Sequence, residues 1–379
     1  MWDRKPSALF ARRTGNTTRA RRGAMGAGIA LLLLFAPAAA SAELVLRFFD
    51  VGQGDATLIQ TTGGCNVLVD AGRHDRDDVV NLLRAANVER LDILVGTHPH
   101  ADHIGQFPQV LATIPVDVVW MSGWQHSTNT FERALDAIIA SGVAYDEPRA
   151  GHVVSCGNAS IAVIHPVEPL TDIHDNLVLR IEYGSFSAVL TGDAEVPHEM
   201  EMLARGEALT AQVLQLGHHG SRTSTSADFL AAVAPQIAIY SAGTGNSFGH
   251  PHHEVLDRLE AQGTRAFGTD IYGTITIQTD GINDTFALSF ERAKPHEAEV
   301  AFVEVGNDMA QNEAGCIDLN GAPFDRLIEI MHINVVRAEA IKELRRNRSF
   351  GAVSDLTRIK GIGASRLRDI EEEGLACVR

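Results

Sequence analysis

The feature that most constrains this chain is the nine-residue stretch THPHADHIG, at residues 97–105. It directly follows a short apolar run at 91–96 that is typical of a buried strand. Four side chains able to bind metal leave this strand within six residues: His98, His100, Asp102 and His103. The first two are two residues apart, so in an extended chain they point the same way. Imidazole and carboxylate groups suit divalent metals, so the stretch predicts a metal site that precedes a helix opening near Ile104.

Other segments of the body also have the pattern of strands that end in polar residues. Strands are predicted at 43–50, 56–60, 66–72, 161–165, 177–183, 187–190, 213–216 and 237–242, and within 266–277. Helices are predicted at 77–86, 131–140 and 253–263. Strands that end in a ligand and alternate with helices indicate an α/β layered fold with one edge that carries the ligands.

Six motifs in this region occur in a characteristic order. They are FFDVGQGDA (48–56), LVDAG (68–72), THPHADHIG (97–105), LTGD (190–193), LGHHGSRTS (216–224) and GHPHHEVLDRL (249–259). Together they resemble the catalytic domain of ComEC-type competence proteins, a branch of the metallo-β-lactamase superfamily. The resemblance covers about residues 44–280, within a hydrolase domain that we place at 43–292. It implies an αββα sandwich with a dinuclear metal site, for two divalent ions such as Zn or Mn, at one edge.

The resemblance also implies a set of ligands for the two metals. The first metal is expected on His98, His100 and His218, and the second on Asp102, His103 and His250. Asp193, at the end of a strand, is the natural carboxylate to bridge them because it has two oxygens. His219 and His252 are alternatives to their histidine neighbours, and His174 is an alternative third histidine. Nearby acids are expected to orient the ligands: Asp50, Asp55 and Asp70.

A metal pair of this kind activates a water and stabilises the developing oxyanion, chemistry that suits a phosphodiester. The residues expected to take part in catalysis are Asp102, Asp193 and Arg222. Arg222 lies in the segment 221–224, whose hydroxyl and guanidinium groups are able to grip a phosphate oxygen. One departure from the family is Asn176, which stands where a serine is common.

The segment 316–379 differs in character from the body and follows a predicted linker at 293–315. Helices are predicted at 324–330, 336–345 and 364–370. The last begins after a tight turn expected to contact DNA phosphates through Lys360, Gly361, Ile362 and Gly363. The segment resembles the tandem helix-hairpin-helix module of ComEA-type DNA receptors. In its first hairpin His332-Ile333-Asn334 replaces Gly-Ile-Gly, although Asn334 is able to adopt positive φ. The alternative is a small helical domain that packs on a partner protein.

Residues 1–42 have the pattern of a secretory signal peptide, with arginines, an apolar core and a final Ala-Ser-Ala. No later stretch is long and apolar enough to span a bilayer, so the mature protein is expected to be secreted or periplasmic. An oxidising compartment allows disulfides, and four cysteines permit three pairings. We favour Cys65–Cys156 and Cys316–Cys377, because each pair then lies inside one predicted domain.

The net charge of the body limits how it can bind nucleic acid. Residues 43–316 contain 14 Lys/Arg against 37 Asp/Glu, which disfavours binding to DNA by loose electrostatic attraction alone. The sequence therefore predicts an exported metal-dependent hydrolase, in the first place a DNA phosphodiesterase. The alternatives are a hydrolase of another phosphoester, such as phosphocholine on surface polymers, and a DNA-binding competence factor with a structural metal. A β-lactamase fits the histidine motifs less well.

Overall fold

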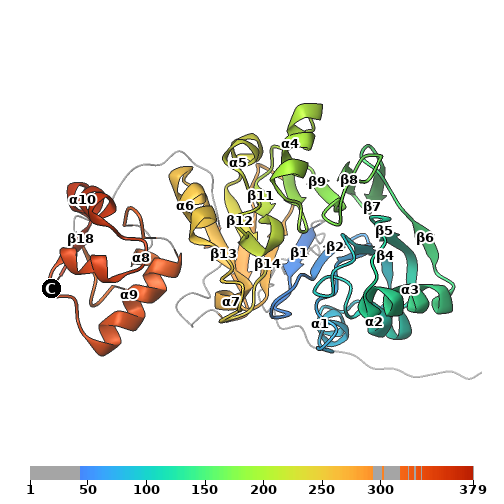
Figure 1. Cartoon of the computed structure of the whole chain (residues 1–379), viewed down its shortest axis with the longest axis horizontal. Helices are drawn as coiled ribbons and strands as arrows, with labels where there is room; N and C mark the ends of the chain where they lie inside the picture. Colours follow the sequence, from blue (N-terminus) through green and yellow to red (C-terminus); the bar gives the residue numbers. More distant parts are fainter. Residues whose placement is uncertain are drawn as a thin grey trace, which may run out of the picture. The chain divides into compact units, whose positions relative to one another are not determined.

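The computed structural model describes residues 43–292, 301–302, 316–322, 324–327, 330–333 and 335–378. In the body, two β-sheets face each other and helices cover the outer side of each sheet (Figure 1). Apolar residues from both sheets fill the space between them, among them Leu46 and Val69 from the first and Ile161 and Leu179 from the second. The predicted α/β class and αββα layering are confirmed.

The first sheet joins the N-terminal strands to the last strands of the body. Its order is β16-β15-β14-β1-β2-β3-β4-β5-β6. The strands are β1 (Leu44–Phe48), β2 (Thr57–Thr61), β3 (Asn66–Val69), β4 (Leu91–Gly96), β5 (Val116–Met121), β6 (Ala144–Asp146), β14 (Ile275–Thr279), β15 (Ala287–Phe290) and β16 (Ala301–Phe302). Strands β3 to β6 run parallel, so their carboxyl ends share one edge. Strand β16 lies inside the predicted linker at 293–315, where its backbone pairs with β15 at the edge of the sheet.

The second sheet has the order β13-β12-β11-β10-β9-β8-β7. Its strands are β7 (Val153–Cys156), β8 (Ala159–His165), β9 (Val178–Tyr183), β10 (Phe186–Leu190), β11 (Val213–Gln215), β12 (Ile237–Tyr240) and β13 (Arg265–Gly268). Strands β10 to β13 are parallel, so the loops after β10, β11 and β12 leave the same edge. Those three loops carry the LTGD, LGHHGSRTS and GHPHHEVLDRL motifs.

Helices cover the two outer faces. The first sheet packs against α1 (Val79–Ala85), α2 (Phe107–Thr113) and α3 (Asn129–Ser141), and the second against α4 (Val196–Arg205), α5 (Ala227–Val233) and α6 (His253–Ala261). Helix α3 starts where the Thr128 hydroxyl accepts a hydrogen bond from the Phe131 N–H, and it ends at Gly142 with φ 66°. The helix expected near Ile104 begins three residues later, because 101–106 form turns. Helix α7 (Thr269–Tyr272) interrupts the strand run predicted at 266–277.

Both predicted disulfides are present. Cys65–Cys156 joins the β2–β3 turn of the first sheet to the end of β7 in the second. Cys316–Cys377 joins the two ends of the C-terminal segment, beside the parallel pair β17 (Ile317–Asp318) and β18 (Ala376–Cys377). The pairing predicted from domain boundaries is confirmed.

The C-terminal segment is helical and has its own buried apolar residues. Its helices are α8 (Phe324–Leu327), α9 (Val335–Asn347), the 3-10 helix η2 (Val353–Arg358) and α10 (Ala364–Glu373). Leu327, Ile341, Leu356 and Ile370 are buried. Two turns in it contain a left-handed residue, His332 with φ 64° and Gly361 with φ 92°. His332 occupies the position that matches Gly361. Asn334, where we expected a positive φ, lies outside the described residues.

The predicted signal peptide at 1–42 and the linker residues 293–300 and 303–315 lie outside the described part of the chain. Within the described part, none of the helices has the length and apolar character needed to cross a membrane.

Candidate metal centre

The carboxyl ends of strands from both sheets meet at the histidine-rich motifs. The first sheet contributes His98 and His100 directly after β4, followed by the turn that carries Asp102 and His103. The second sheet contributes Asp193 after β10, His218 and His219 after β11, and His250 after β12. The strand ends of the two sheets therefore bring together residues that are up to 152 positions apart in the chain, from His98 to His250.

Asp193 lies at the centre of this group and is almost fully buried. Its Oδ1 is 3.2 Å from His103 Nε2 and 3.7 Å from His219 Nε2. Its Oδ2 is 3.5 Å from His98 Nε2 and 3.7 Å from His218 Nε2. Each carboxylate oxygen therefore faces its own pair of imidazoles, as a bridging carboxylate requires.

Two groups of potential ligands share this carboxylate. His98, His100 and Asp193 form one group, and Asp55, His103, Asp193 and His219 form the other, with the ligand atoms of each group within 4.8 Å of one another. Asp102 Oδ2 approaches the second group, 3.3 Å from His219 Nε2. Asp55, which we expected to orient ligands, thus lies among them.

The polar atoms at the centre fit metal ions better than they fit each other. Among the described residues, His103 Nε2, Asp193 Oδ1 and His219 Nε2 are buried without a hydrogen-bond partner. A buried polar atom without a partner costs about 1–3 kcal/mol, and this cost falls on three neighbouring atoms. All three offer lone pairs to borderline divalent metals once the imidazoles lose their protons, so the residues present fit the metal site that the motifs predict.

The protonation of the group follows from burial and from the central carboxylate. Burial, together with the nearby His103, lowers the pKa of His98, and burial beside His98 lowers the pKa of His100 to about 3. Burial opposes the charged form of Asp193, but His103 and His219 hold its pKa well below the usual range. Burial likewise opposes the charge on His219, yet Asp193 and Asp102 raise its pKa to about 9. Without metal, protonated imidazoles therefore neutralise the negative charge of the carboxylates. A bound divalent cation would take over this role and displace their protons.

His218 and His219 both reach the centre because of an unusual backbone. They lie in the 3-10 turn η1 (Gly217–Gly220), and their φ values are 51° and 58°. We expected His219 as an alternative to His218. The structure brings both rings to Asp193, because these two consecutive residues are left-handed. Such conformations cost of order 1–3 kcal/mol and concentrate at functional sites.

Buried polar residues hold the ligands in place. Asp70, itself left-handed at φ 62°, binds His103 Nδ1 at 2.7 Å and accepts hydrogen bonds from the N–H and hydroxyl of Thr97. The Asn176 side-chain oxygen accepts a hydrogen bond from the Asp193 N–H at 2.9 Å. These contacts fix the ring and carboxylate orientations before any metal binds.

The remaining predicted residues lie at the edge of the group. His250 has ring contacts with His218 and His219 at 5.7 and 5.9 Å, outside either ligand group. Burial and the neighbouring His219 lower the pKa of His250 to about 4, so it is neutral near pH 7. His174 lies 5.5 Å from the His218 ring and forms a third group with His218 and Glu195. Arg222 is exposed and pairs with Glu254 at 3.3 Å, so it does not point at the centre.

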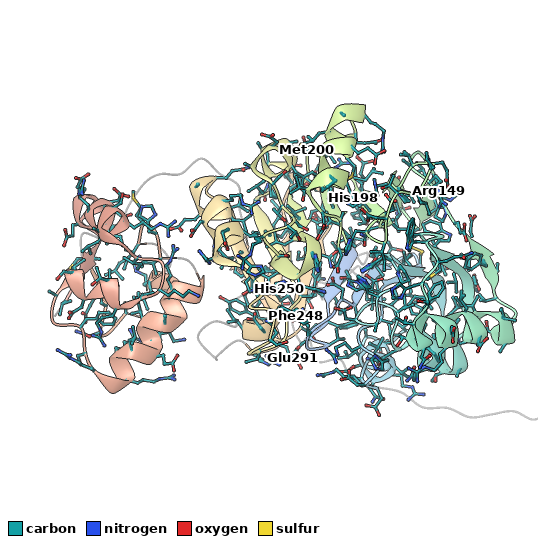
Figure 2. All side chains as sticks on the ribbon, viewed as in Figure 1. Arg149, His198, Met200, Phe248, His250 and Glu291 are labelled. Carbon is teal, nitrogen blue, oxygen red and sulfur yellow. A yellow bond between two sulfur atoms is a disulfide. The ribbon has the colours of Figure 1, made fainter. Side chains whose placement is uncertain are left out.

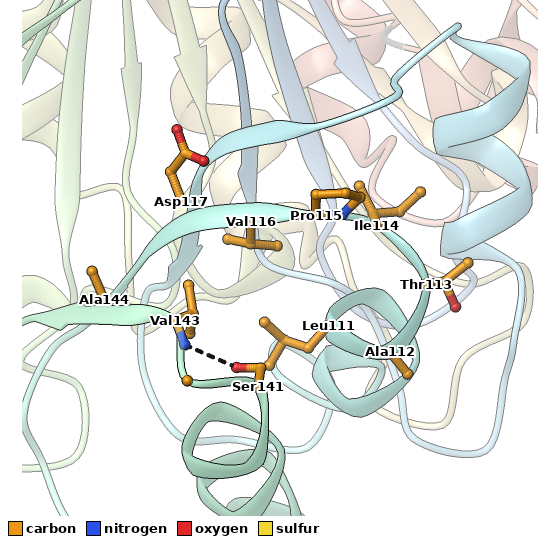
Figure 3. A pocket seen from close by; sticks show the side chains of 11 residues that line it. Leu111, Ala112, Thr113, Ile114, Pro115, Val116, Asp117, Ser141, Val143 and Ala144 are labelled. Atoms are coloured by element: carbon orange, nitrogen blue, oxygen red, sulfur yellow. Dashed lines mark hydrogen bonds between the residues drawn. The ribbon is translucent and has the colours of Figure 1, made fainter.

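A separate hollow of about 550 Å³ lies at the amino ends of β5 and β6, between the turns that follow α2 and α3 (Figure 3). Leu111, Ile114, Pro115 and Val143 contribute aliphatic groups to its lining, and its carboxylate, Asp117, pairs with Arg90. The described residues that line it include no histidine or cysteine, and we assign it no function.

Comparison with known families agrees with this geometry. The sequence model of the metallo-beta-lactamase superfamily matches residues 49–244, just over half of the chain. The chain belongs to the metallo-beta-lactamase superfamily. The match contains the THPHADHIG stretch, Asp193 and both histidines of η1, and it ends before His250.

Within this metallo-beta-lactamase family, the relatives include proteins of bacterial competence. ComE operon protein 3 of Bacillus subtilis is 31% identical over 278 residues, covering 68% of this chain and 36% of that protein. Competence protein ComA of Neisseria gonorrhoeae is 32% identical over 239 residues, covering 62% of this chain and 32% of that protein. A deoxyribonuclease of Thioalkalivibrio is 46% identical over 89 residues, covering 24% of this chain and 22% of that protein. The chain spans about a third of the length of the two competence relatives.

This metallo-beta-lactamase domain contains a second pair of buried histidines, His165 and His198, near Asn176. They allow a prediction about how stability depends on pH. His165 Nδ1 binds the Asn176 carbonyl at 2.9 Å, and its ring lies 5.3 Å from that of His198. His198 lies on α4 (Figure 2). Burial, with the neighbouring His198, lowers the pKa of His165, although Asp175 and Glu201 oppose this. The native state therefore resists a proton that the unfolded chain takes up near pH 6.5.

We expect the free energy of unfolding to fall as pH drops below about 6.5, by up to about 1.4 kcal/mol per pH unit from this group. Replacing His165→Gln should remove that share of the pH dependence. Urea unfolding of both proteins at pH 7.5 and 5.5 measures it. An equal pH dependence in the two proteins would show that another group is responsible.

Proposed function

We propose that this protein is an exported phosphodiesterase that cleaves DNA with two divalent metal ions, Zn or Mn. The observation that carries the proposal is the position of Asp193, whose two oxygens each face a separate pair of histidines. We assign the first metal to His98, His100 and His218, and the second to Asp102, His103 and His219, with Asp193 between them. His219 replaces His250 in this assignment because it reaches Asp193, whereas His250 stands one ring farther out.

The metals, when bound, would activate a water and stabilise negative charge on the phosphate. The protein residues prepare this chemistry. His98 and His100 are kept neutral by burial, so their lone pairs are free at neutral pH. Asp70 binds the Nδ1 side of His103 and leaves its Nε2 facing Asp193. The Ser241 carbonyl lies 3.0 Å from His219 Nδ1, which fixes that ring in the same way.

DNA is the substrate that the relatives and the C-terminal segment favour together. One relative is named a deoxyribonuclease, and another a competence protein. We assign residues 316–379 to a helix-hairpin-helix module that binds the phosphate backbone around Lys360, Gly361, Ile362 and Gly363. The left-handed backbone at both His332 and Gly361 supports a pair of matching hairpins. Both disulfides agree with export into an oxidising compartment.

The test is a direct assay of protein that begins at residue 43. Plasmid, linear DNA and bis(p-nitrophenyl) phosphate are each incubated with Mn²⁺, with Zn²⁺ or with EDTA. We expect hydrolysis of DNA and of the small diester with metal, and none with EDTA. Cleavage of p-nitrophenyl phosphorylcholine without cleavage of DNA would replace the proposal by the phosphocholine alternative.

The C-terminal assignment gives a prediction with a matched control. Gly361 has φ 92°, which a side chain disfavours, whereas Gly363 has φ −91° and open space around its Cα. We expect Gly361→Ala to weaken DNA binding and to lower the salt slope of log K by about one for each lost phosphate contact. Gly363→Ala keeps its N–H and should bind as the wild type does.

Binding curves at several salt concentrations measure both variants. Hydrolysis of the small diester should be unchanged in both, because none of the assigned metal ligands lies in residues 316–379. Equal affinity and slope for Gly361→Ala and wild type would show that this turn does not contact DNA.

A further inference from the structure

A column of aromatic rings leads from the candidate metal centre to the surface. The rings of His103 and His219 are 5.2 Å apart and inclined by 35°. Those of His219 and His250 are 5.9 Å apart at 30°, and those of His250 and Phe248 are 5.6 Å apart at 21°. The rings become more nearly parallel toward the surface, and the column ends at Phe248. Figure 2 labels its two outer residues, His250 and Phe248. Its inner end is a proposed metal ligand, and its outer end is an apolar ring.

Phe248 is 59% exposed, although it has a neighbour to stack on. Large apolar side chains are usually buried, so an aromatic ring held out at the mouth of a polar site suggests a binding surface. The ring belongs to the loop after β12, which leads into His250 and then α6. The Phe248 ring therefore lies beside the candidate metal centre.

The loop that carries Phe248 is held by hydrogen bonds to its own backbone and to the loop between β1 and β2. The Asn246 side chain donates to the carbonyls of Gly243 and His250 and accepts from the His250 N–H. The Gly243 N–H donates to the Gln53 side-chain oxygen at 3.2 Å. These bonds fix both ends of the loop, so that Phe248 is presented in a set orientation and a ligand need not order it.

The charges near the column favour binding of a ligand by stacking on an aromatic ring over binding by electrostatic attraction. The body is strongly acidic, and the exposed cations Arg222 and Arg292 are paired with Glu254 and Asp50. Loose attraction of phosphates to this surface is therefore weak, apart from the metals themselves. A nucleobase offers a neutral aromatic face that stacks on an aromatic side chain whatever its sequence.

We propose that the outer face of Phe248 stacks on a nucleobase adjacent to the scissile phosphate, which makes a strand with unpaired bases the preferred substrate. This inference rests on the proposed phosphodiesterase function and specifies its substrate. A base inside a duplex is already stacked on both faces, so only an unpaired base can lie on Phe248 without an unstacking cost. The column then continues by one more ring, and the phosphate next to that base is brought to the metals.

The experiment compares Phe248→Ala with Ile282→Ala, an equally exposed apolar residue (57%) on the turn after β14. Both are assayed in Mn²⁺ on a single-stranded oligonucleotide and on the same strand with abasic sites. We expect Phe248→Ala to raise KM for the base-bearing strand about tenfold, the size of one stacking contact, and to leave the abasic strand unchanged. Ile282→Ala should change neither value. An unchanged ratio between the two strands in Phe248→Ala would overturn the inference.

A second readout does not depend on hydrolysis. In Phe248→Trp, stacking should quench the indole fluorescence when the base-bearing strand is added in EDTA, and the abasic strand should not quench it. Base-dependent quenching without any cleavage in Mn²⁺ would support the stacking site and reject the phosphodiesterase. Cleavage by the wild type without quenching, and without a change in the KM ratio, would reject the stacking site alone.

Discussion

Replacing Asp193→Ala is expected to lower phosphodiester hydrolysis by at least about a thousandfold, because both proposed metals lose their shared ligand. Asp193 is also the main source of negative charge for the imidazoles of His103 and His219. Without it, these buried rings lose the carboxylate that stabilises their protons. The variant should therefore bind less metal, and its pair of sites should no longer act together.

The measurement is metal content per chain together with the rate on bis(p-nitrophenyl) phosphate. A suitable control is Asp270→Asn, because Asp270 is a half-buried acid after β13 whose pKa burial raises to about 6, and it contacts none of the proposed ligands. The control should keep its metal and its rate. Two metals per chain and normal activity in Asp193→Ala would show that this carboxylate does not bridge.

Gly54→Ala is expected to have the second largest effect, although Gly54 offers no ligand. Gly54 has φ 144°, and a Cβ there would lie 2.5 Å from the Asp102 carbonyl oxygen. The same carbonyl accepts a hydrogen bond from the Asp55 N–H at 3.1 Å. The added methyl group must therefore push Asp102 away from His219, and it also strains its own backbone. We expect a loss of metal affinity or activity of about 10- to 100-fold.

This loss should fall on the second metal, which Asp102 and His219 are proposed to hold, and titration of the apoprotein with Mn²⁺ would detect it. Gly151→Ala is the matched control, because Gly151 has φ 94° but nothing within 4 Å of its Cβ position. It tests the backbone strain without the collision. An equal loss in the two variants would show that backbone strain, and not the collision with Asp102, causes the effect.

The first half of the site was predictable because its geometry is local. His98 and His100 extend a strand, and the period of a strand places both side chains on one side. The second half depends on backbone that residue patterns do not reveal. His219 reaches Asp193 only because two successive residues are left-handed, and nothing in Leu-Gly-His-His-Gly requires this. The sequence contains both His219 and His250. We assign His219 because of its backbone φ, which the sequence did not reveal.

The fold class was also predictable, because alternating strand and helix patterns are local features of the sequence. Several individual elements were not predicted. Strand β5, which was not predicted, has a polar Asp117 on an otherwise apolar run, and β6 is three exposed residues. Helices α2 and α4 each follow a loop that carries candidate metal ligands, and each has a proline in its first turn. We read the residues before each helix as part of the motif and did not predict where the helix begins. Strand β16 has two residues, too few to form a recognisable sequence pattern.

The contribution of both sheets to one group of ligands has a consequence for how the fold responds to its surroundings. β4 supplies His98 and His103 from one sheet, and β10 and β11 supply Asp193 and His219 from the other. A cation held between them, as we propose, would act as a reversible cross-link, while Cys65–Cys156 forms a permanent one elsewhere between the same sheets. At a thousand times its dissociation constant, a ligand specific for the native state stabilises it by about 4 kcal/mol. The melting temperature of this protein would then depend on the concentration of free metal, and loss of metal would expose the sandwich to proteolysis as well as stop the proposed hydrolysis.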